Sequence, residues 1–276
     1  MLSNFIHWNL NPEIFNIEGF ALRYYSLLFV SGLILGYLIL RKIYRLEQIP
    51  IEKLDKLAIY VFVGTIVGAR LGHCLFYEPD YYLKHPLDII LPFRGTPGID
   101  FRFTGYQGLA SHGGAIGVFL AVYLYARKYK QSLLWVFDRL VIVVALAGCC
   151  IRLGNFMNSE IIGSPSNLPW AIIFERVDNI PRHPAQLYEA LSYLVIFGSL
   201  ITLNFKKATS LKPGFMFGIF LIALFSMRFL LEFLKENQEG FENNMLLNMG
   251  QILSIPFIIA GILLIFRSKH DNTPIQ

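Results

Sequence analysis

Long apolar runs alternate with short polar stretches along almost the whole chain. Each run holds roughly 18 to 23 residues, which is enough for an α-helix to cross the hydrocarbon core of a bilayer. The runs cover approximately residues 19–40, 54–76, 107–126, 134–151, 185–204, 214–234 and 247–266. This pattern predicts an all-α, polytopic integral membrane protein with seven transmembrane helices, in which residues 1–276 form a single transmembrane domain.

The composition agrees with a chain that lies in a membrane. Hydrophobic residues make up 55% of the sequence and charged residues 16%, which is too apolar for an ordinary soluble domain. The formal net charge is +5, but the basic residues follow the apolar runs in short clusters and form no basic face, so we expect no nucleic-acid partner. Three cysteines, with Cys149 and Cys150 adjacent, build no disulfide framework and are expected to pack.

The distribution of Lys and Arg predicts how the helices are oriented. The first 19 residues contain neither residue type, whereas Lys and Arg together are concentrated in four short loops: 41–53, 127–133, 205–213 and 267–276. Because cytoplasmic loops carry such an excess, we expect the N-terminus outside and the C-terminus in the cytoplasm. The two long loops, about 77–106 and 152–184, then lie on the outer face. Loops of this length are usually functional, so we expect the working face there.

Glycines recur at four-residue spacing inside several apolar runs. They are Gly32 and Gly36; Gly64, Gly68 and Gly72; Gly113 and Gly117; and Gly214 and Gly218. Small residues at this spacing let the backbones of two membrane helices approach closely. We therefore expect these glycines to mark helix contacts.

Charged residues inside the runs carry the most information, because an Arg or Asp at the centre of a membrane helix costs about 2.5–3.5 kcal/mol. Arg228 and Glu232 are four residues apart, so they could neutralise each other on one helix face. Asp138 is expected at the membrane interface, as is its neighbour Arg139. For Arg70, pairing with a glutamate and contact with a ligand both stay open.

A polar group gathers where the fourth helix is expected to reach the outer side. Arg152 is followed by Asn155, Asn158 and Glu160, and four such residues together indicate a site more than an accident of packing. His112, in GLASHGGAIG at the outer start of the third helix, is either a hydrogen-bonding residue or a catalyst. His183 either stabilises a turn or supports the site. No motif with metal-ligand spacing is present.

Arginines, amides and one histidine at the outer leaflet suit chemistry on a phospholipid. The planar guanidinium matches a phosphodiester, asparagine orients neutral oxygens, and histidine takes a proton near neutral pH. The residues therefore indicate transfer of a group from a phospholipid. A transporter or lipid-binding module stays open. A head-group transferase with paired aspartates and a divalent metal is less favoured, because the chain has no D-x-x-D-G run.

Seven motifs lie in order along the whole chain: RYYSLLF, GARLGHCLFY, SHGGAIG, RLGNFMNSE, PRHPAQLYE, RFLLEFLKE and MGQILSIP. Together they resemble the motifs of the bacterial prolipoprotein diacylglyceryl transferase family. The combination of R-L-G-N-F-x-N-x-E with H-G-G and R-H-P-x-Q-L-Y-E is highly specific. The chain departs from the family at Ile151 and Ser159, where glycine is common.

The resemblance implies an enzyme of the bacterial cytoplasmic (inner) membrane with its active site towards the outer face. Its partners would be phosphatidylglycerol and prolipoprotein signal peptides with a lipobox cysteine, and the reaction would form a thioether and release glycerol phosphate without a cofactor or metal. Catalysis would fall to His112, Arg152 and Arg228. The two arginines would also bind substrate, together with Tyr25, Asn155, Asn158, Glu160 and Gly163. Supporting residues would be Arg70, His183, Glu189 and Glu232.

Overall fold

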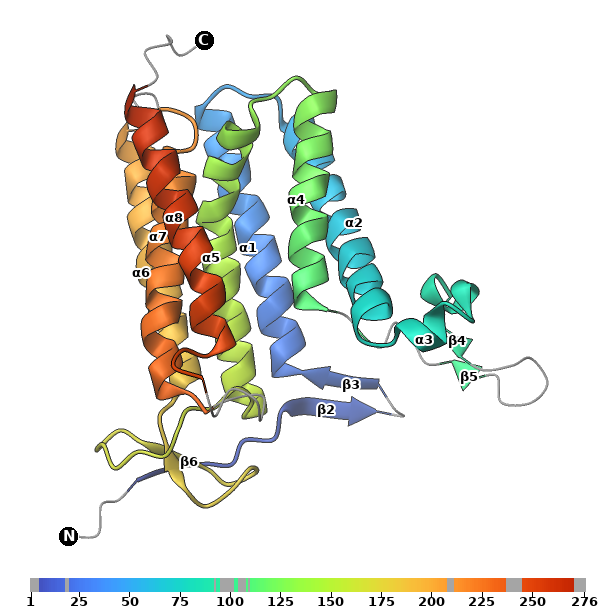
Figure 1. The fold of residues 1–276 in the computed structure, drawn as a ribbon, viewed down its shortest axis with the longest axis vertical. Coiled ribbons are helices and arrows are strands. Elements are labelled where there is room, and N and C mark those ends of the chain that lie inside the picture. Colours follow the sequence, from blue (N-terminus) through green and yellow to red (C-terminus); the bar gives the residue numbers. More distant parts are fainter. Residues whose placement is uncertain are drawn as a thin grey trace. The chain divides into compact units, whose positions relative to one another are not determined.

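The structure is a computed structural model, and it is built mainly from long helices with short strands beside them (Figure 1). It describes residues 5–17, 20–91, 93–94, 102–103, 108, 110–207, 211–236 and 245–270. In these residues, six helices are long and apolar enough to cross a membrane: α1 (Tyr24–Leu46), α2 (Ile51–Phe76), α5 (Leu133–Asn158), α6 (Ala185–Lys207), α7 (Phe215–Leu231) with the turn after it, and α8 (Met249–His270). The chain is thus a polytopic, mainly helical membrane protein.

The remaining predicted span, 107–126, contains a helix from residue 111 onwards. It corresponds to α4 (Ser111–Lys128), an 18-residue helix that is not among the six. Two predicted boundaries were wrong. The first span does not begin at residue 19, because Phe20–Arg23 forms strand β3 and the helix begins at Tyr24. The loop expected from residue 152 begins only after Asn158, because α5 contains no proline that would end it earlier.

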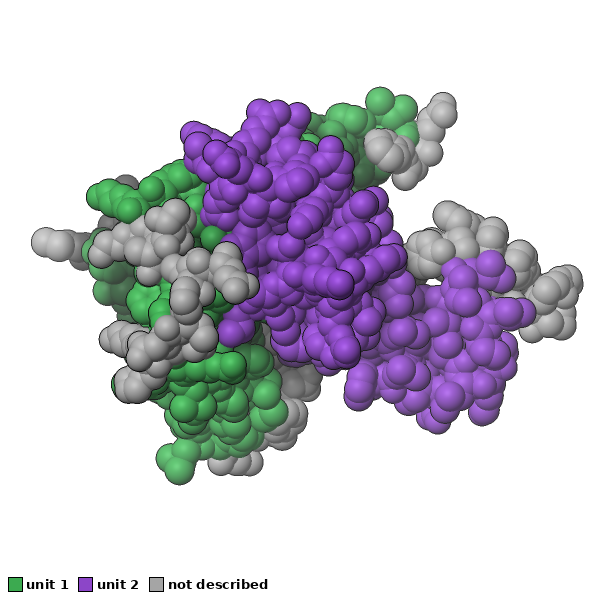
Figure 2. All heavy atoms as spheres, turned by 90° about the horizontal axis from the view of Figure 1, so that it is seen from above, with its two compact units in different colours: residues 1–40, 137–276 green, residues 41–136 purple. Residues whose placement is uncertain are grey.

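The chain divides into two compact units, residues 1–40 with 137–276 and residues 41–136 (Figure 2). In the second unit, α2 packs against α4 through glycines on both helices. A Cβ on Gly68 would collide with the carbonyl oxygen of Gly113 and lie 2.7 Å from the Cα of Gly117. The predicted helix contact of these glycines is therefore confirmed. Beyond α2 come α3 (Pro79–Tyr82), the 3₁₀ turn η1 (Pro86–Ile89) and the hairpin of β4 (Phe93–Arg94) and β5 (Arg102–Phe103).

In the first unit, α5 contacts both α1 and α6. A Cβ on Gly32 of α1 would meet Cys150 of α5 at 3.1 Å, and a Cβ on Gly148 of α5 would meet the Tyr193 ring of α6 at 2.6 Å. The α7 and α8 helices cross at Gly218 and Gly261, where a Cβ would lie within 2.9 Å of the facing carbonyl oxygen. Cys149 and Cys150 are buried and free, as a packing role requires.

Asp138 is buried in α5 and caps another helix of the same unit. Its carboxylate accepts hydrogen bonds from the backbone N–H groups of Gly214 and Phe217, both at 2.7 Å. These groups begin α7 and have no partner inside their own helix. A carboxylate there also meets the positive end of the helix dipole. Asp138 thereby fixes where α7 starts relative to α5.

Short strands of the first unit lie next to the ends of its helices. The hairpin of β2 (Glu13–Ile17) and β3 leads directly into α1, and Glu13 pairs with Arg23 across it at 3.1 Å (Figure 1). A second sheet has the order β1 (Ile6–Trp8), β6 (Ile172–Phe174), β7 (Pro181–Arg182). Trp8 packs on Phe156 of α5 with ring centroids 4.4 Å apart. The N-terminal segment is thereby attached to the end of α5.

We predict that Gly68→Ala lowers the thermal stability of the purified protein. The added methyl group has no space between the two backbones, and overpacking of this kind costs about 1–3 kcal/mol. Gly198→Ala is the matched control, because a Cβ at Gly198 in α6 meets nothing within 4 Å. Thermal unfolding in detergent should separate the two variants. Equal unfolding temperatures would contradict the close packing of α2 on α4.

Candidate active site

The polar residues that follow Arg152 lie on the last turns of α5 and on the turn that ends it. Ser159 takes the left-handed conformation, with φ of +57°. The Ser159 N–H donates to the carbonyl of Phe156 at 3.1 Å, and the Glu160 N–H donates to that of Asn155 at 2.9 Å. These two bonds form a Schellman motif, in which the left-handed position is most often glycine. The turn reverses the chain and brings Glu160 back towards the helix.

Glu160 is held by both asparagines that the sequence singled out. Its two carboxylate oxygens accept from the side-chain amides of Asn155, at 3.2 Å, and Asn158, at 3.1 Å. Its backbone carbonyl accepts from the buried side-chain amide of Gln186 in α6 at 2.6 Å. The structure therefore brings Asn155, Asn158 and Glu160 together, and α6 holds the turn on which they depend.

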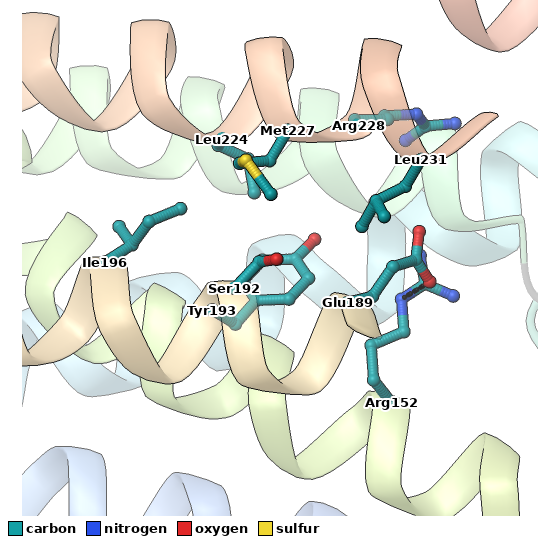
Figure 3. A pocket seen from close by; sticks show the side chains of 9 residues that line it. All are labelled: Arg152, Glu189, Ser192, Tyr193, Ile196, Leu224, Met227, Arg228 and Leu231. Carbon is teal, nitrogen blue, oxygen red and sulfur yellow. Dashed lines mark ion pairs between the residues drawn. The ribbon is translucent and has the colours of Figure 1, made fainter. Parts of the chain in front are cut away.

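Arg152 forms a buried ion pair with Glu189, which lies on α6. The Arg152 Nε lies 2.9 Å from the Glu189 Oε2, and the two side chains are 18% and 5% exposed (Figure 3). A further contact at 3.4 Å runs from the Arg152 guanidinium to the Asn155 side-chain oxygen. Arg152 thus connects the α5 turn to α6.

Glu189 and Glu232 share a second cation, Lys235, that the sequence analysis did not single out. The Lys235 Nζ lies 2.8 Å from Glu189 Oε1 and 3.1 Å from Glu232 Oε2. The pairing of Glu232 with Arg228 that their spacing allows is not formed: Glu232 pairs with Lys235. Glu232 follows the end of α7 at Leu231 and begins the 3₁₀ turn η2 (Glu232–Leu234). Residues three apart eclipse in a 3₁₀ turn, so Glu232 is aligned with Lys235.

A narrow pocket opens beside the Arg152–Glu189 pair, between α6 and α7. Arg228 lies on the side of the pocket opposite Arg152, and it makes no ion pair with any residue that the structure describes (Figure 3). Tyr193 lines the pocket one turn along α6 from Glu189. The rest of the lining comes from Ser192, Ile196, Leu224, Met227 and Leu231. The pocket therefore has an arginine on each of two sides and an apolar wall.

Gly163 and His183 lie together beyond the α5 turn. The Gly163 N–H donates to the His183 carbonyl at 2.9 Å, and a Cβ on Gly163 would lie 2.5 Å from that oxygen and 2.8 Å from the carbonyl oxygen of Leu234. His183 also contacts the Tyr188 hydroxyl through Nδ1 at 3.3 Å. Gly163 is therefore enclosed on both sides by backbone, and only glycine fits there.

Arg182 stabilises the same region. Its guanidinium donates to the Gly163 carbonyl at 3.3 Å and to the Asp178 carboxylate at 2.6 Å. The hydrogen bond from Arg182 holds the pKa of Asp178 below its usual value. Asp178 in turn raises the pKa of Arg182. Both side chains are charged at neutral pH. The ion pair with Asp178 therefore orients the Arg182 guanidinium, which joins β7 to the Gly163 carbonyl.

Of the other predicted site residues, Tyr25 lies in the same compact unit as Arg152, whereas His112 and Arg70 belong to the second unit. The Tyr25 ring packs on Gly154, where a Cβ would come within 2.7 Å of its Cδ2, and the charges of Glu160 and Arg152 act on its hydroxyl. In that second unit, residues 41–136, His112 is exposed in the first turn of α4. Arg70 is buried.

Arg70 is attached to the segment that follows α2. Its guanidinium donates to the backbone carbonyls of Asp88 and Ile89, the latter at 3.0 Å, and stacks over the Tyr82 ring with 5.0 Å to the centroid. These contacts attach α2 to η1 and α3. In this unit Arg70 thus organises the segment that follows α2.

Three residues near the site escaped the sequence analysis: Gln186, Tyr193 and Lys235. Gln186 and Lys235 stand inside two of the motifs quoted above, and Tyr193 lies four residues after Glu189, so a helical projection from Glu189 could have found it. Within the described ranges, no three His, Cys, Asp or Glu side chains gather as they would around a metal ion.

Comparisons with known proteins decide the family. Residues 12–267 match the family model described as prolipoprotein diacylglyceryl transferase. The chain belongs to this family. A phosphatidylglycerol–prolipoprotein diacylglyceryl transferase of Bacteroides fragilis is 50% identical over 261 residues, which cover 95% of this chain and 94% of the relative. Proteins of the same name from Tolumonas auensis and Chloroherpeton thalassium are 48% and 44% identical, over 97% and 96% of this chain and 99% and 95% of their own.

Membership of the prolipoprotein diacylglyceryl transferase family makes the chain a transferase, and its motifs coincide with the geometry above. The run from Arg152 to Glu160 contains the last turns of α5 and the Schellman motif. The run from Pro181 to Glu189 contains β7 and the first turns of α6, including Gln186. The two motifs meet at the Arg152–Glu189 ion pair and at the bond from Gln186 to Glu160.

We predict opposite effects of glycine at the two positions where this chain departs from the family. Ser159→Gly should stabilise the protein by about 1 kcal/mol, because a left-handed conformation costs an L-residue about 1–2 kcal/mol. Ile151→Gly should destabilise it by at least about 1 kcal/mol, because Ile151 lies inside α5. The difference should appear as a separation of several degrees in unfolding temperature. A destabilised Ser159→Gly protein would contradict the assigned turn.

Proposed function

We propose that the chain transfers the diacylglyceryl group of phosphatidylglycerol to the lipobox cysteine thiol of a prolipoprotein, the first step of lipoprotein maturation. The observation that carries the proposal is the pocket between α6 and α7, with Arg152 and Arg228 on opposite sides and an apolar wall. The names of the relatives support the choice of lipid and acceptor. Both compact units together would form one catalytic domain.

In this proposal the two arginines bind the phosphate of the lipid. Arg152 is held in place by Glu189, while the guanidinium of Arg228 is available for an anion. Planar guanidinium groups bind phosphate oxygens in a bidentate way. The surrounding residues would shape the head-group site: Tyr25, Asn155, Asn158, Glu160 and Gly163. Supporting positions would be taken by Arg70, His183, Glu189 and Glu232.

The reaction would be a direct displacement. The sulfur of the cysteine forms a bond to the glycerol carbon that carries the phosphate ester oxygen. The bond from that carbon to oxygen breaks, and its electron pair leaves with glycerol phosphate. The thiol proton passes to His112, the candidate base. Charge develops on the departing phosphate, so arginines placed there stabilise the transition state more than the ground state.

We also propose the orientation in the membrane. α4 would be a seventh span, so that the N-terminus lies outside and the C-terminus in the cytoplasm. The excess of Lys and Arg in loops 41–53 and 127–133 supports this orientation. The ends of α5 and α7 that carry Asn158 and Glu232 would then face outward, as would Glu160. The enzyme would act from the outer side of the bacterial cytoplasmic (inner) membrane.

Arg152→Ala should reduce the transfer rate by about 10²–10³-fold, because a preorganised charge at the departing phosphate is lost. The measurement is mass spectrometry of a lipobox cysteine peptide incubated with the purified full chain and phosphatidylglycerol. The wild-type protein should add one diacylglyceryl group to the peptide. Phosphatidylcholine in place of phosphatidylglycerol should give no adduct.

The matched control is Arg267→Ala, which removes an exposed arginine near the end of α8. This variant should keep the wild-type rate. No adduct from folded wild-type protein would overturn the proposed function and favour transport or lipid binding. Equal rates for Arg152→Ala and the wild type would remove Arg152 from the reaction.

His112→Gln should slow transfer at neutral pH, and the loss should shrink as the pH rises. A cysteine thiol ionises with a pKa near 8.5, so above that value the acceptor needs no base. The measurement is the ratio of wild-type to variant rates between pH 6.5 and about 9.5. His7→Gln serves as control, since His7 is exposed and pairs with Glu175 at 2.8 Å. A ratio of one at neutral pH would exclude His112 as the base.

A further inference from the structure

The structure assigns a positioning role to Lys235: it balances the charge of Glu189 and Glu232 and so leaves Arg152 and Arg228 available for an anionic lipid. This inference rests on the proposed function. Lys235 is almost completely buried, with a side-chain exposure of 5%. Both of its ion-pair partners are buried as well, at 5% and 9% exposure. Burying an ammonium group and two carboxylates costs desolvation free energy, which only the attraction between these opposite charges offsets.

The ion pairs form one chain of charges across three elements. Arg152 of α5 contacts Oε2 of Glu189, and Lys235 contacts Oε1 of the same carboxylate. Lys235 also reaches Glu232 at the start of η2. Two carboxylates thus face two cations, and the network is neutral. Arg228, on the other side of the pocket, remains as positive charge for a phosphate (Figure 3).

Lys235 also determines how strongly Glu189 holds Arg152. A carboxylate and a guanidinium form their strongest pair when both oxygens engage the same fork. Here Glu189 divides its two oxygens between Arg152 and Lys235. Without the ammonium group, both oxygens could engage Arg152, and the negative charge of Glu232 would be left uncompensated beside the site. Both changes oppose binding of a phosphate.

The backbone places Lys235 independently of its side chain. Lys235 forms an isolated bridge with Gly163, and the Ser164 N–H donates to the Leu234 carbonyl at 2.9 Å. The Ser164 hydroxyl donates to the same carbonyl at 3.2 Å. The backbone of Gly163 and Ser164, after α5, therefore holds the backbone of Leu234 and Lys235 in place. Replacing the Lys235 side chain leaves these backbone bonds intact, so its charge can be tested separately.

The test compares charge variants of the full-length protein. Lys235→Met should raise the KM for phosphatidylglycerol at least about tenfold with a smaller effect on kcat, because the loss falls on anion binding. Lys235→Arg should stay near the wild type. The decisive variant is Lys235→Met with Glu232→Gln, which makes the network neutral again and should recover most of the lost affinity. Unfolding temperatures of the single and double variants are measured as well, because a residue that only supports the fold would change stability and leave the KM of the folded protein unchanged.

The control is Lys206→Met, which removes an exposed lysine near the end of α6 and should change nothing. Monodisperse protein with a normal unfolding temperature establishes that each variant is folded. An unchanged KM in Lys235→Met, or a double variant no better than the single one, would overturn the inference. If the wild type itself forms no adduct, the proposed function fails; retention of phosphatidylglycerol in native mass spectra then tests Lys235 alone, and equal retention by Lys235→Met overturns it.

Discussion

Buried charge is the constraint on which the rest of this structure depends. Arg152, Glu189, Glu232 and Lys235 are each costly in apolar surroundings, and none can be left without an opposite charge. Their pairing joins α5 to α6 and α6 to the turn after α7. A helix rotated by one residue would separate these charges. The ion pairs therefore determine the register of the helices around the pocket, beyond what apolar packing alone would specify.

The backbone around the site is arranged to support these charges. The Schellman motif at Ser159 reverses the chain, the bond from Gln186 holds the reversed segment, and the bridge from Gly163 reaches Lys235. Loop segments far apart in the sequence thus satisfy one another's hydrogen bonds. Such a surrounding shell keeps catalytic side chains in a productive geometry. The Asp138 cap fixes the opposite end of α7, so the helix that carries Arg228 is held at both ends.

Sequence patterns located the helices well because the signal is physical and local. An apolar run long enough to cross a bilayer forms a helix regardless of its neighbours, since within a single segment only a helix satisfies the backbone hydrogen bonds in lipid. The glycine spacing in α2 and α4 correctly indicated close contact for a similar reason. The boundaries were less accurate. Hydropathy decreases at Arg152, whereas α5 continues to Asn158. A helix can continue through polar residues, so the drop in hydropathy does not mark its end.

The sequence by itself determined the helical membrane class, the approximate spans and the residue types grouped after Arg152, because these follow from local hydropathy and spacing. It did not determine which of these side chains contact one another. Arg228 and Glu232 stand four apart, as a pair on one helix would, yet Glu232 pairs with Lys235, three residues later. Gln186 and Lys235 have no distinctive local pattern. Only the tertiary structure decided the contacts of Glu189 with Arg152 and Lys235 and of Gln186 with Glu160, because the packing of separate elements brings these residues within reach of one another.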